Sequence, residues 1–222
     1  MYGTGFLKDE NGNDVYNIDS NGNIEPIKDP NLRLLGNYNP DFTLGWNNHF
    51  KYKNFDLSFL WDWRQGGTIV SRQLSLASTS GNLNTTAYRP QSGIIPAGAV
   101  LTGYDSNGNP QTRPFAQNET MNAVRYYKSF YDRDNEDNHK YNASFLKLRQ
   151  IAIGYAFPKK TLGNLIQELR VSLIGRNLLL FTQNPHFDPE VLAVQGQNFV
   201  PGVEDMALPS ERTVGININV KF

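Results

Sequence analysis

The stretch that decides the fold is residues 42–64, FTLGWNNHFKYKNFDLSFLWDWR, in which apolar and polar side chains alternate. The apolar positions, many of them aromatic, keep one parity through 42–52 and again through 55–63, with Leu60 as the one exception. A two-residue period is that of a β-strand, and Lys53-Asn54 is short enough for a tight turn. Each run is about as long as the 9–11 residues that a tilted strand needs to cross a bilayer. The stretch therefore predicts a β-hairpin with one apolar face.

Three further strands follow the same pattern, in residues 142–157, 168–180 and 212–222. In the first of them Leu146 and Leu148 lie on the opposite parity to Ile151 and Ile153. A switch of the apolar face requires an irregularity, so we expect a β-bulge, or a strand end above the membrane, near Gln150.

The connections between these strands alternate in length: short at 53–54, long at 66–141, short at 158–167 and long at 181–210. Short turns on one side and long loops on the other are typical of bacterial outer-membrane barrels. We predict an all-β fold, namely an antiparallel transmembrane β-barrel segment with long extracellular loops. It would supply about five to six C-terminal strands of a larger barrel.

The predicted organisation treats residues 1–222 as the C-terminal part of a larger barrel. Two short helical segments are expected in the connections, at Thr68–Ala77 and in the turn at 159–167. The segments in chain order are a loop and hairpin region at 1–41, a β-hairpin at 42–64, a long external loop at 65–141, two strands with a periplasmic turn at 142–180, an external loop at 181–210 and a closing C-terminal strand at 211–222.

Three turn signals share the pattern Asp-X-Asn-Gly-Asn, at residues 9–13, 19–23 and 105–109. Asn-Gly supplies the two positive-φ residues of a type I′ turn, so each is expected to be a hairpin tip. The oxygen-rich spacing also suggests a calcium loop, but no turn has the bidentate Glu that such a loop needs. We therefore favour hairpins over metal sites.

The composition excludes several functions. The chain of 222 residues has 21 basic and 21 acidic side chains, so no net charge favours nucleic acid. There is no cysteine, which excludes a disulfide framework. No stretch approaches 18 consecutive apolar residues, and the N-terminus has no signal peptide, so we expect a fragment of an exported protein.

No enzyme is predicted. Nothing resembles the Gly-x-Ser-x-Gly elbow or a metal-binding histidine pair, and His49, His139 and His186 are scattered through the sequence. Neither catalytic residues nor a cofactor nor a metal site is therefore assigned.

The last strand alternates Val, Ile, Ile, Val and Phe with polar residues and ends on an aromatic ring. It could be the edge strand of a soluble sheet, but an open apolar edge is an aggregation hazard that closure of a barrel removes. The run resembles the C-terminal signal that the outer-membrane assembly machinery reads. The signal would consist of Gly215, Ile218, Val220 and Phe222.

Several segments resemble, in order, the C-terminal part of SusC/RagA-family TonB-dependent transporters of Bacteroidota. The resemblance extends over most of 36–222 and is weak in 1–35 and inside the 66–141 loop. The segments are GNYNPDFTLG (36–45), FDLSFL (55–60), RQGG (64–67), FLKLR (145–149), IGY (153–155), FP (157–158), GRNL (175–178), FT (181–182), FDPE (187–190) and PSERT (209–213).

The resemblance implies a large outer-membrane barrel in contact with lipid, an N-terminal plug that is missing here, and energy supplied through the TonB complex. It also implies a SusD-like surface lipoprotein as partner and import of glycans or peptides. In the resemblance Asp188-Pro189-Glu190 is a hallmark of an external loop, and we interpret it as structural rather than catalytic.

Aromatic rings at loop positions are the candidates for ligand contact, because a ring can stack on the flat face of a sugar. Loop rings also commonly pack within their own loop. The candidates are Tyr88, Tyr104, Tyr126 and Tyr127. Trp46, Trp61 and Trp63 belong instead to the predicted lipid-facing girdle.

Two other functions compete with the importer. A soluble carbohydrate-binding β-sandwich would have apolar faces from two sets of strands packed against each other, with short loops at both ends. A small self-assembling outer-membrane or adhesin-like protein would build one barrel from several copies.

Overall fold

The computed structural model describes residues 1–184, 186–190, 193–195 and 198–222. The chain divides into two compact units. The mixed unit comprises Met1–Tyr38, Thr68–Tyr141 and Leu192–Met206. The sheet unit comprises Asn39–Gly67, Asn142–Val191 and Ala207–Phe222.

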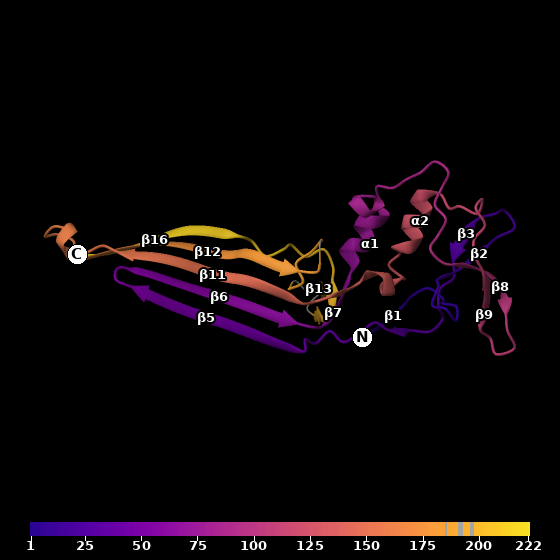
Figure 1. The fold of residues 1–222 in the computed structure, drawn as a ribbon, viewed down its shortest axis with the longest axis horizontal. Helices are drawn as coiled ribbons and strands as arrows, with labels where there is room; N and C mark the ends of the chain where they lie inside the picture. The colour runs from indigo at the N-terminus through magenta and orange to yellow at the C-terminus, as the bar shows by residue number, and fades with distance from the viewer. Residues whose placement is uncertain (185, 191–192, 196–197) are drawn as a thin grey trace. The chain divides into compact units, whose positions relative to one another are not determined.

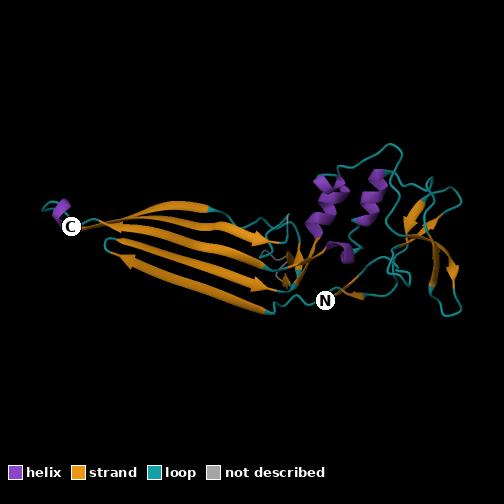
Figure 2. Ribbon diagram, in the orientation of Figure 1, coloured by secondary structure: helices purple, strands orange, loops and turns teal. Residues whose placement is uncertain are grey.

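The sheet unit contains one antiparallel sheet of long strands, which lie side by side in Figures 1 and 2. Their order across the sheet is β16-β12-β11-β6-β5. The predicted hairpin is confirmed, with Lys53 in the left-handed region at its turn. The strands are β5 (Phe42–Tyr52), β6 (Phe55–Gln65), β11 (Phe145–Ala156), β12 (Glu168–Thr182) and β16 (Thr213–Lys221).

The register brings the predicted apolar positions of all five strands onto one face. One row crosses the whole sheet through directly paired residues, and most of its side chains are exposed. Cross-strand apolar pairs stabilise a sheet, but here they leave an apolar surface uncovered within the unit. The row is Phe50, Leu57, Ile153, Leu173 and Ile216.

The opposite face is polar, as the alternation predicts. The adjacent row through the same strands is Lys51, Asp56, Gly154, Ser172 and Asn217. A Cβ on Gly154 would lie 2.6 Å from the carboxylate of Asp56. The glycine therefore leaves room for that carboxylate to pair across β11 with Arg170.

The bulge predicted near Gln150 is confirmed. The register of β11 shifts between Leu148 and Gln150 against both neighbouring strands. On the β12 side the irregularity includes Asn177, whose φ is +52°. The shift restores apolar residues to one face: Leu148 pairs with Trp61 before it, and Ile151 pairs with Phe59 after it.

The segments predicted as loops hold more secondary structure than expected. In the mixed unit four short strands form a sheet in the order β3-β2-β8-β9, and β10-β7-β15 form another. The two remaining small sheets pair β1 with β4 and β13 with β14. The strands are β1 (Tyr2–Gly3), β2 (Val15–Ile18), β3 (Ile24–Pro26), β4 (Arg33–Leu34), β7 (Thr68–Ser71), β8 (Ala99–Tyr104), β9 (Pro110–Arg113), β10 (Lys140–Asn142), β13 (Ala193–Gln195), β14 (Asn198–Val200) and β15 (Val203–Glu204).

The helix predicted over Thr68–Ala77 begins later than expected. Residues 68–71 form β7, which pairs in parallel with β15, and α1 spans Arg72–Thr79. Ser71 caps the helix because its Oγ accepts a hydrogen bond from the Leu74 amide at 3.2 Å. The other helices are α2 (Ala123–Phe130) and the short 3₁₀ turns η1 (Asn84–Thr86), η2 (Glu136–His139) and η3 (Lys159–Thr161).

A small apolar core holds the mixed unit together. Tyr16, Ile24 and Met121 are buried against one another, and Phe115 and Tyr126 pack on them. Among the described residues no helix is long and apolar enough to cross a membrane.

The three Asp-X-Asn-Gly-Asn segments are hairpin tips, but not of the predicted type. Only the glycine of each has a positive φ, so a type I turn followed by a left-handed glycine replaces the type I′ turn. The aspartate explains the difference. In the 105–109 tip, for example, the Asp105 carboxylate accepts hydrogen bonds from the amides of Asn107 and Asn109, at 2.9 and 2.7 Å.

We predict that Gly108→Ala loosens the β8–β9 hairpin. Gly108 has a φ of +83° and no atom near its missing Cβ, so the substitution acts through backbone strain, which costs about 1 kcal/mol. Gly103→Ala is the matched control, because Gly103 also has open space but not a positive φ. Amide hydrogen exchange should speed up in 99–113 for the first variant only. Equal exchange in the two variants would contradict the strain argument.

Candidate functional site

A cluster of charged side chains lies on the polar face of the sheet unit, centred on Lys147 of β11. Lys147 pairs in register with Asp62 and is only 1% exposed. Its ammonium group donates to Asp188 at 3.1 Å, to Glu190 at 2.7 Å and to the Ser210 hydroxyl at 2.5 Å. A buried ammonium is tolerated only when it is paired in this way.

Arg149, the residue at the bulge, extends the cluster. Its guanidinium donates to Asp62 of β6 at 2.9 and 2.5 Å. It also binds both carboxylate oxygens of Glu190. A planar guanidinium is suited to such two-pronged pairing. Arg149 thus links the carboxylate of Glu190, in the loop, to β6, the strand that neighbours β11.

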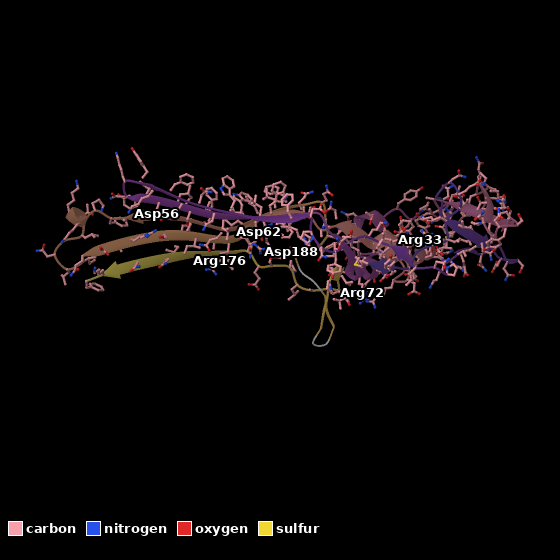
Figure 3. The ribbon with its side chains drawn as sticks, turned by 90° about the horizontal axis from the view of Figure 1, so that it is seen from below. Arg33, Asp56, Asp62, Arg72, Arg176 and Asp188 are labelled. Carbon is pink, nitrogen blue, oxygen red and sulfur yellow. The ribbon has the colours of Figure 1, made fainter. Side chains whose placement is uncertain are left out.

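Asp188 joins the loop to the residues that precede the last strand. Its carboxylate accepts hydrogen bonds from the Glu190 amide and from both the amide and the hydroxyl of Ser210. Three separate segments, 145–149, 187–190 and 209–210, therefore meet at one place. In Figure 3 Asp62 and Asp188 lie near one end of the sheet, whereas Asp56 lies towards the other. We call Asp62, Lys147, Arg149, Asp188, Glu190 and Ser210 the loop-anchoring cluster.

The electrostatics of the cluster favour ionised carboxylates. Burial alone would raise the pKa of Asp188, but hydrogen bonds from Ser210, the Glu190 amide and Lys147 outweigh burial and lower it. In the same way, burial alone would raise the pKa of Glu190, but hydrogen bonds from Arg149 and Lys147 outweigh burial and lower it. Every charged group here has a partner, and among the described residues no group of acidic or histidine side chains could hold a metal ion. The arrangement is suited to anchoring a loop, not to acid–base chemistry.

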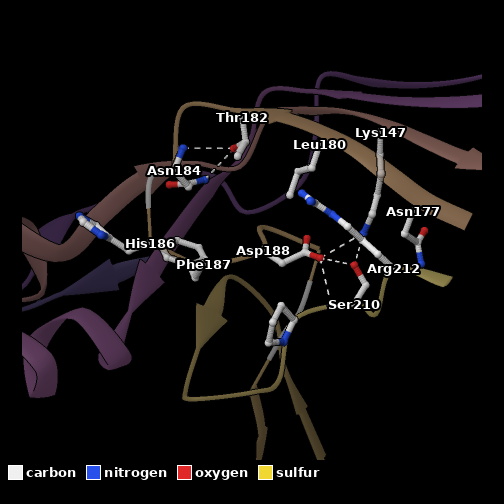
Figure 4. A pocket seen from close by; sticks show the side chains of 11 residues that line it. Lys147, Asn177, Leu180, Thr182, Asn184, His186, Phe187, Asp188, Ser210 and Arg212 are labelled. Carbon is white, nitrogen blue, oxygen red and sulfur yellow. Dashed lines mark hydrogen bonds and ion pairs between the residues drawn. The ribbon is translucent and has the colours of Figure 1, made fainter. Parts of the chain in front are cut away.

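A hollow of about 620 Å³ opens beside the cluster (Figure 4). Lys147, Asp188 and Ser210 form part of its lining, and Figure 4 shows their hydrogen bonds. The other lining residues are Asn177, Leu180, Thr182, Asn184, His186, Phe187, Pro209 and Arg212.

The sequence pointed to the segments of this cluster but not to the contacts between them. FLKLR, FDPE and PSERT are all quoted in the resemblance, and Asp188-Pro189-Glu190 was expected to have a structural role, which the ion pairs support. The pairing of Lys147 and Arg149 with the loop was not foreseen. The available signal was a pair of cations, two residues apart, between apolar positions of one strand.

The four candidate tyrosines lie in the mixed unit, in different environments. Tyr88 and Tyr104 are exposed, and Tyr104 ends β8. Tyr126 and Tyr127 belong to α2, where Tyr126 stacks on Phe130 with 5.8 Å between ring centroids. Tyr127 is buried, and its hydroxyl donates to the Tyr88 carbonyl oxygen at 2.8 Å. Two of the four rings are thus free to meet a ligand, and two pack within the unit.

The residues of the predicted assembly signal lie on or just after β16, at one edge of the sheet. Ile218 and Val220 belong to the apolar face through their pairs with Val171 and Leu169. Gly215 pairs with Ile174 on the polar face, and the Phe222 ring is exposed.

Curated relatives carry a consistent name. TonB-dependent receptor P3 of Formosa agariphila is 30% identical over 219 residues, which cover 96% of this chain and 19% of the receptor. TonB-dependent receptor P39 of the same organism is 29% identical over 215 residues. The chain thus spans about a fifth of the length of these relatives. No family model matches.

Solved structures agree on the fold. The RagAB peptide importer in its closed-closed state matches 99% of this chain and 22% of its own, with a TM-score of 0.58 at 17% identity. The open-open state of RagAB gives a TM-score of 0.57 at 16% identity. At such low identity the likeness shows the fold alone. Together with the curated relatives it confirms the resemblance: over nearly its whole length the chain is similar in sequence to TonB-dependent receptors and in fold to part of the RagAB importer.

We predict that Lys147→Met frees the 181–210 connection. The substitution leaves Asp188 buried without its cation, and breaking a buried pair from one side typically costs about 3–5 kcal/mol. Lys51→Met is the matched control, because Lys51 is an exposed lysine on the same face of the sheet. Limited proteolysis should cut 181–210 faster in the first variant only. An unchanged cleavage rate would contradict the anchoring role.

The same anchor should weaken in acid. Because folding lowers the pKa of Asp188 and Glu190, their contribution is present above their unfolded pKa values, about 4, and is lost as the pH falls below them. Proteolysis of 181–210 by an acid-active protease should therefore accelerate as the pH falls below about 4. Asp188→Asn should flatten this dependence, and an equally steep profile in that variant would contradict the assignment.

Proposed function

We propose that the chain forms part of an outer-membrane TonB-dependent transporter that imports oligosaccharides or peptides. The observation that carries the proposal is the two-faced sheet. Five strands of 9 to 15 residues expose an apolar face on one side and a polar face on the other. Tilted strands of about this length, apolar towards lipid and polar towards the lumen, are the unit of an outer-membrane barrel wall.

Both edges of the sheet support a larger barrel. β5 and β16 are the outermost strands, and neither has a second neighbour among the described residues. Long edges of this kind invite further pairing, and closure of a barrel provides it. We assign β16, with Gly215, Ile218, Val220 and Phe222, to the closing seam and its assembly signal.

The partners are inferred from the resemblance to SusC/RagA-type transporters. We assign to the whole receptor a SusD-like surface lipoprotein, energy from the TonB complex and contact with outer-membrane lipid. A solved relative is a peptide importer, which supports transport as the activity. Tyr88 and Tyr104 remain our candidates for ligand contact from the exposed loops, and the hydroxyl of Tyr127 supports the backbone of Tyr88.

The soluble sandwich finds no support in the sheet unit. A sandwich would bury its apolar face beneath a second sheet, yet Ile216 is 70% exposed and Leu173 is 52% exposed. The self-assembling alternative is less favoured because the curated relative that the chain matches is a receptor about five times as long.

We predict that Ile216→Arg prevents stable insertion and that Asn217→Arg does not. The two residues are neighbours at the middle of β16, both exposed, but they lie on opposite faces. An arginine facing lipid near the bilayer centre costs about 2–4 kcal/mol, whereas one facing the lumen is tolerated. The yield of heat-modifiable protein in the outer-membrane fraction measures the difference.

Equal yields of the two variants would contradict the assignment of the sheet to the wall of a membrane barrel. The same conclusion would follow if the unaltered protein stayed soluble and monomeric without detergent. Uptake is tested separately: loss of TonB should abolish substrate accumulation while the amount of receptor in the membrane stays unchanged.

A further inference from the structure

A second hollow, of about 550 Å³, lies wholly within the mixed unit. Its walls are two stretches of chain, 88–95 and 117–120. No acidic or basic side chain lines it, in contrast to the hollow beside the loop-anchoring cluster. The lining residues are Tyr88, Ser92, Gly93, Ile94, Ile95, Gln117, Asn118 and Thr120.

The two walls are joined to each other by backbone hydrogen bonds. Ile94 and Met121 form an antiparallel bridge, with N–H···O distances of 2.7 and 2.8 Å. Met121 is part of the buried core of the unit. At Gly93 a Cβ would lie 2.8 Å from the Met121 carbonyl oxygen, and φ is +83°, so the close approach of the walls requires glycine there.

Each wall is also braced from behind. The Tyr127 hydroxyl holds the Tyr88 carbonyl oxygen, which fixes the backbone and leaves the Tyr88 ring 70% exposed. On the other wall the Arg113 guanidinium binds Glu119 through two hydrogen bonds of 2.7 and 2.8 Å. The hydrogen bonds from Arg113 lower the pKa of Glu119 to about 2, so this brace persists at any physiological pH.

The side chains that face the hollow are not used by these braces. Among the described residues no hydrogen bond involves the side chains of Ser92, Gln117 or Asn118, and all three are exposed. Small-molecule sites commonly combine a preformed backbone with an exposed ring and with amide and hydroxyl groups that are available for hydrogen bonds to the ligand.

We propose that this hollow is a binding subsite for an uncharged sugar residue of an oligosaccharide. The Tyr88 ring would stack on the flat C–H face of the pyranose, and the Gln117 and Asn118 amides would exchange hydrogen bonds with its hydroxyls. The absence of a lining charge favours a neutral glycan over a uronate or a peptide terminus, either of which needs a charged partner. This inference rests on the proposed import function and names the substrate class and its contacts.

The test uses the receptor that carries this chain, purified in detergent. Binding of maltohexaose, cellohexaose and mannohexaose is measured by calorimetry at pH 5 and pH 8. At least one of them should bind equally at both pH values, because no titratable acidic or basic side chain lines the hollow. Tyr88→Ala should weaken that binding by about tenfold, as expected for loss of an aromatic contact. Asn118→Ala should weaken it too, and Tyr88→Phe should retain it.

Tyr2→Ala is the matched control, because Tyr2 is an equally exposed ring of the mixed unit and does not line the hollow. It should bind like the unaltered protein. Equal affinity of Tyr88→Ala and Tyr2→Ala would overturn the subsite, and so would binding of hexauronates or hexapeptides alone. Failure to bind any of the three neutral probes at millimolar concentration would also overturn it. Outer-membrane yield and TonB-dependent uptake of other substrates report separately on the proposed function.

Discussion

The ammonium group of Lys147 is the constraint on which the course of the chain around the sheet depends. It lies in the middle strand of five and is almost completely removed from water, a position that is costly unless anionic partners remain against it. Asp188, Glu190 and Ser210 all come from the connection between β12 and β16. One nitrogen atom therefore anchors a long loop and places the residues from which the edge strand begins.

The bulge explains how β11 places its two cations on the polar face of the sheet and its leucine and isoleucine side chains on the apolar face. Lys147 and Arg149 keep the two-residue spacing that puts their side chains on the polar side. The extra residue at the bulge then reverses the alternation of side chains. As a result Ile151 lies on the same apolar face as Leu148, although the two residues are three positions apart. Without the shift the strand would place either its cations or its second apolar run on the wrong face. The irregularity is thus required by the charge cluster and the apolar face together.

Much of the sheet could be predicted from the sequence because its determinants are local. The alternation in 42–64 and 213–221 predicts both the strands and their faces, and the parity switch predicts the bulge. The mixed unit could not be predicted, since its core joins Tyr16 and Ile24 to Met121 across about a hundred residues. The turn type was missed because the Asp105 side chain, not the Asn-Gly pair, determines the backbone. The charge cluster was missed because its partners are far apart along the chain.

The two units differ in how they remove apolar surface from water. The mixed unit has an interior, with Val15, Ile69 and Leu74 among its buried side chains. Among the described residues of the sheet unit, the buried apolar side chains include Ala143, Phe145 and Leu148, all at the loop end, while the long apolar face stays exposed. A soluble protein rarely leaves a patch of that extent uncovered. In the proposed barrel wall, lipid hydrocarbon would cover that face and take the place of a second protein layer. The contrast between the buried core of the mixed unit and the uncovered face of the sheet unit is therefore the strongest physical argument for the proposed membrane environment.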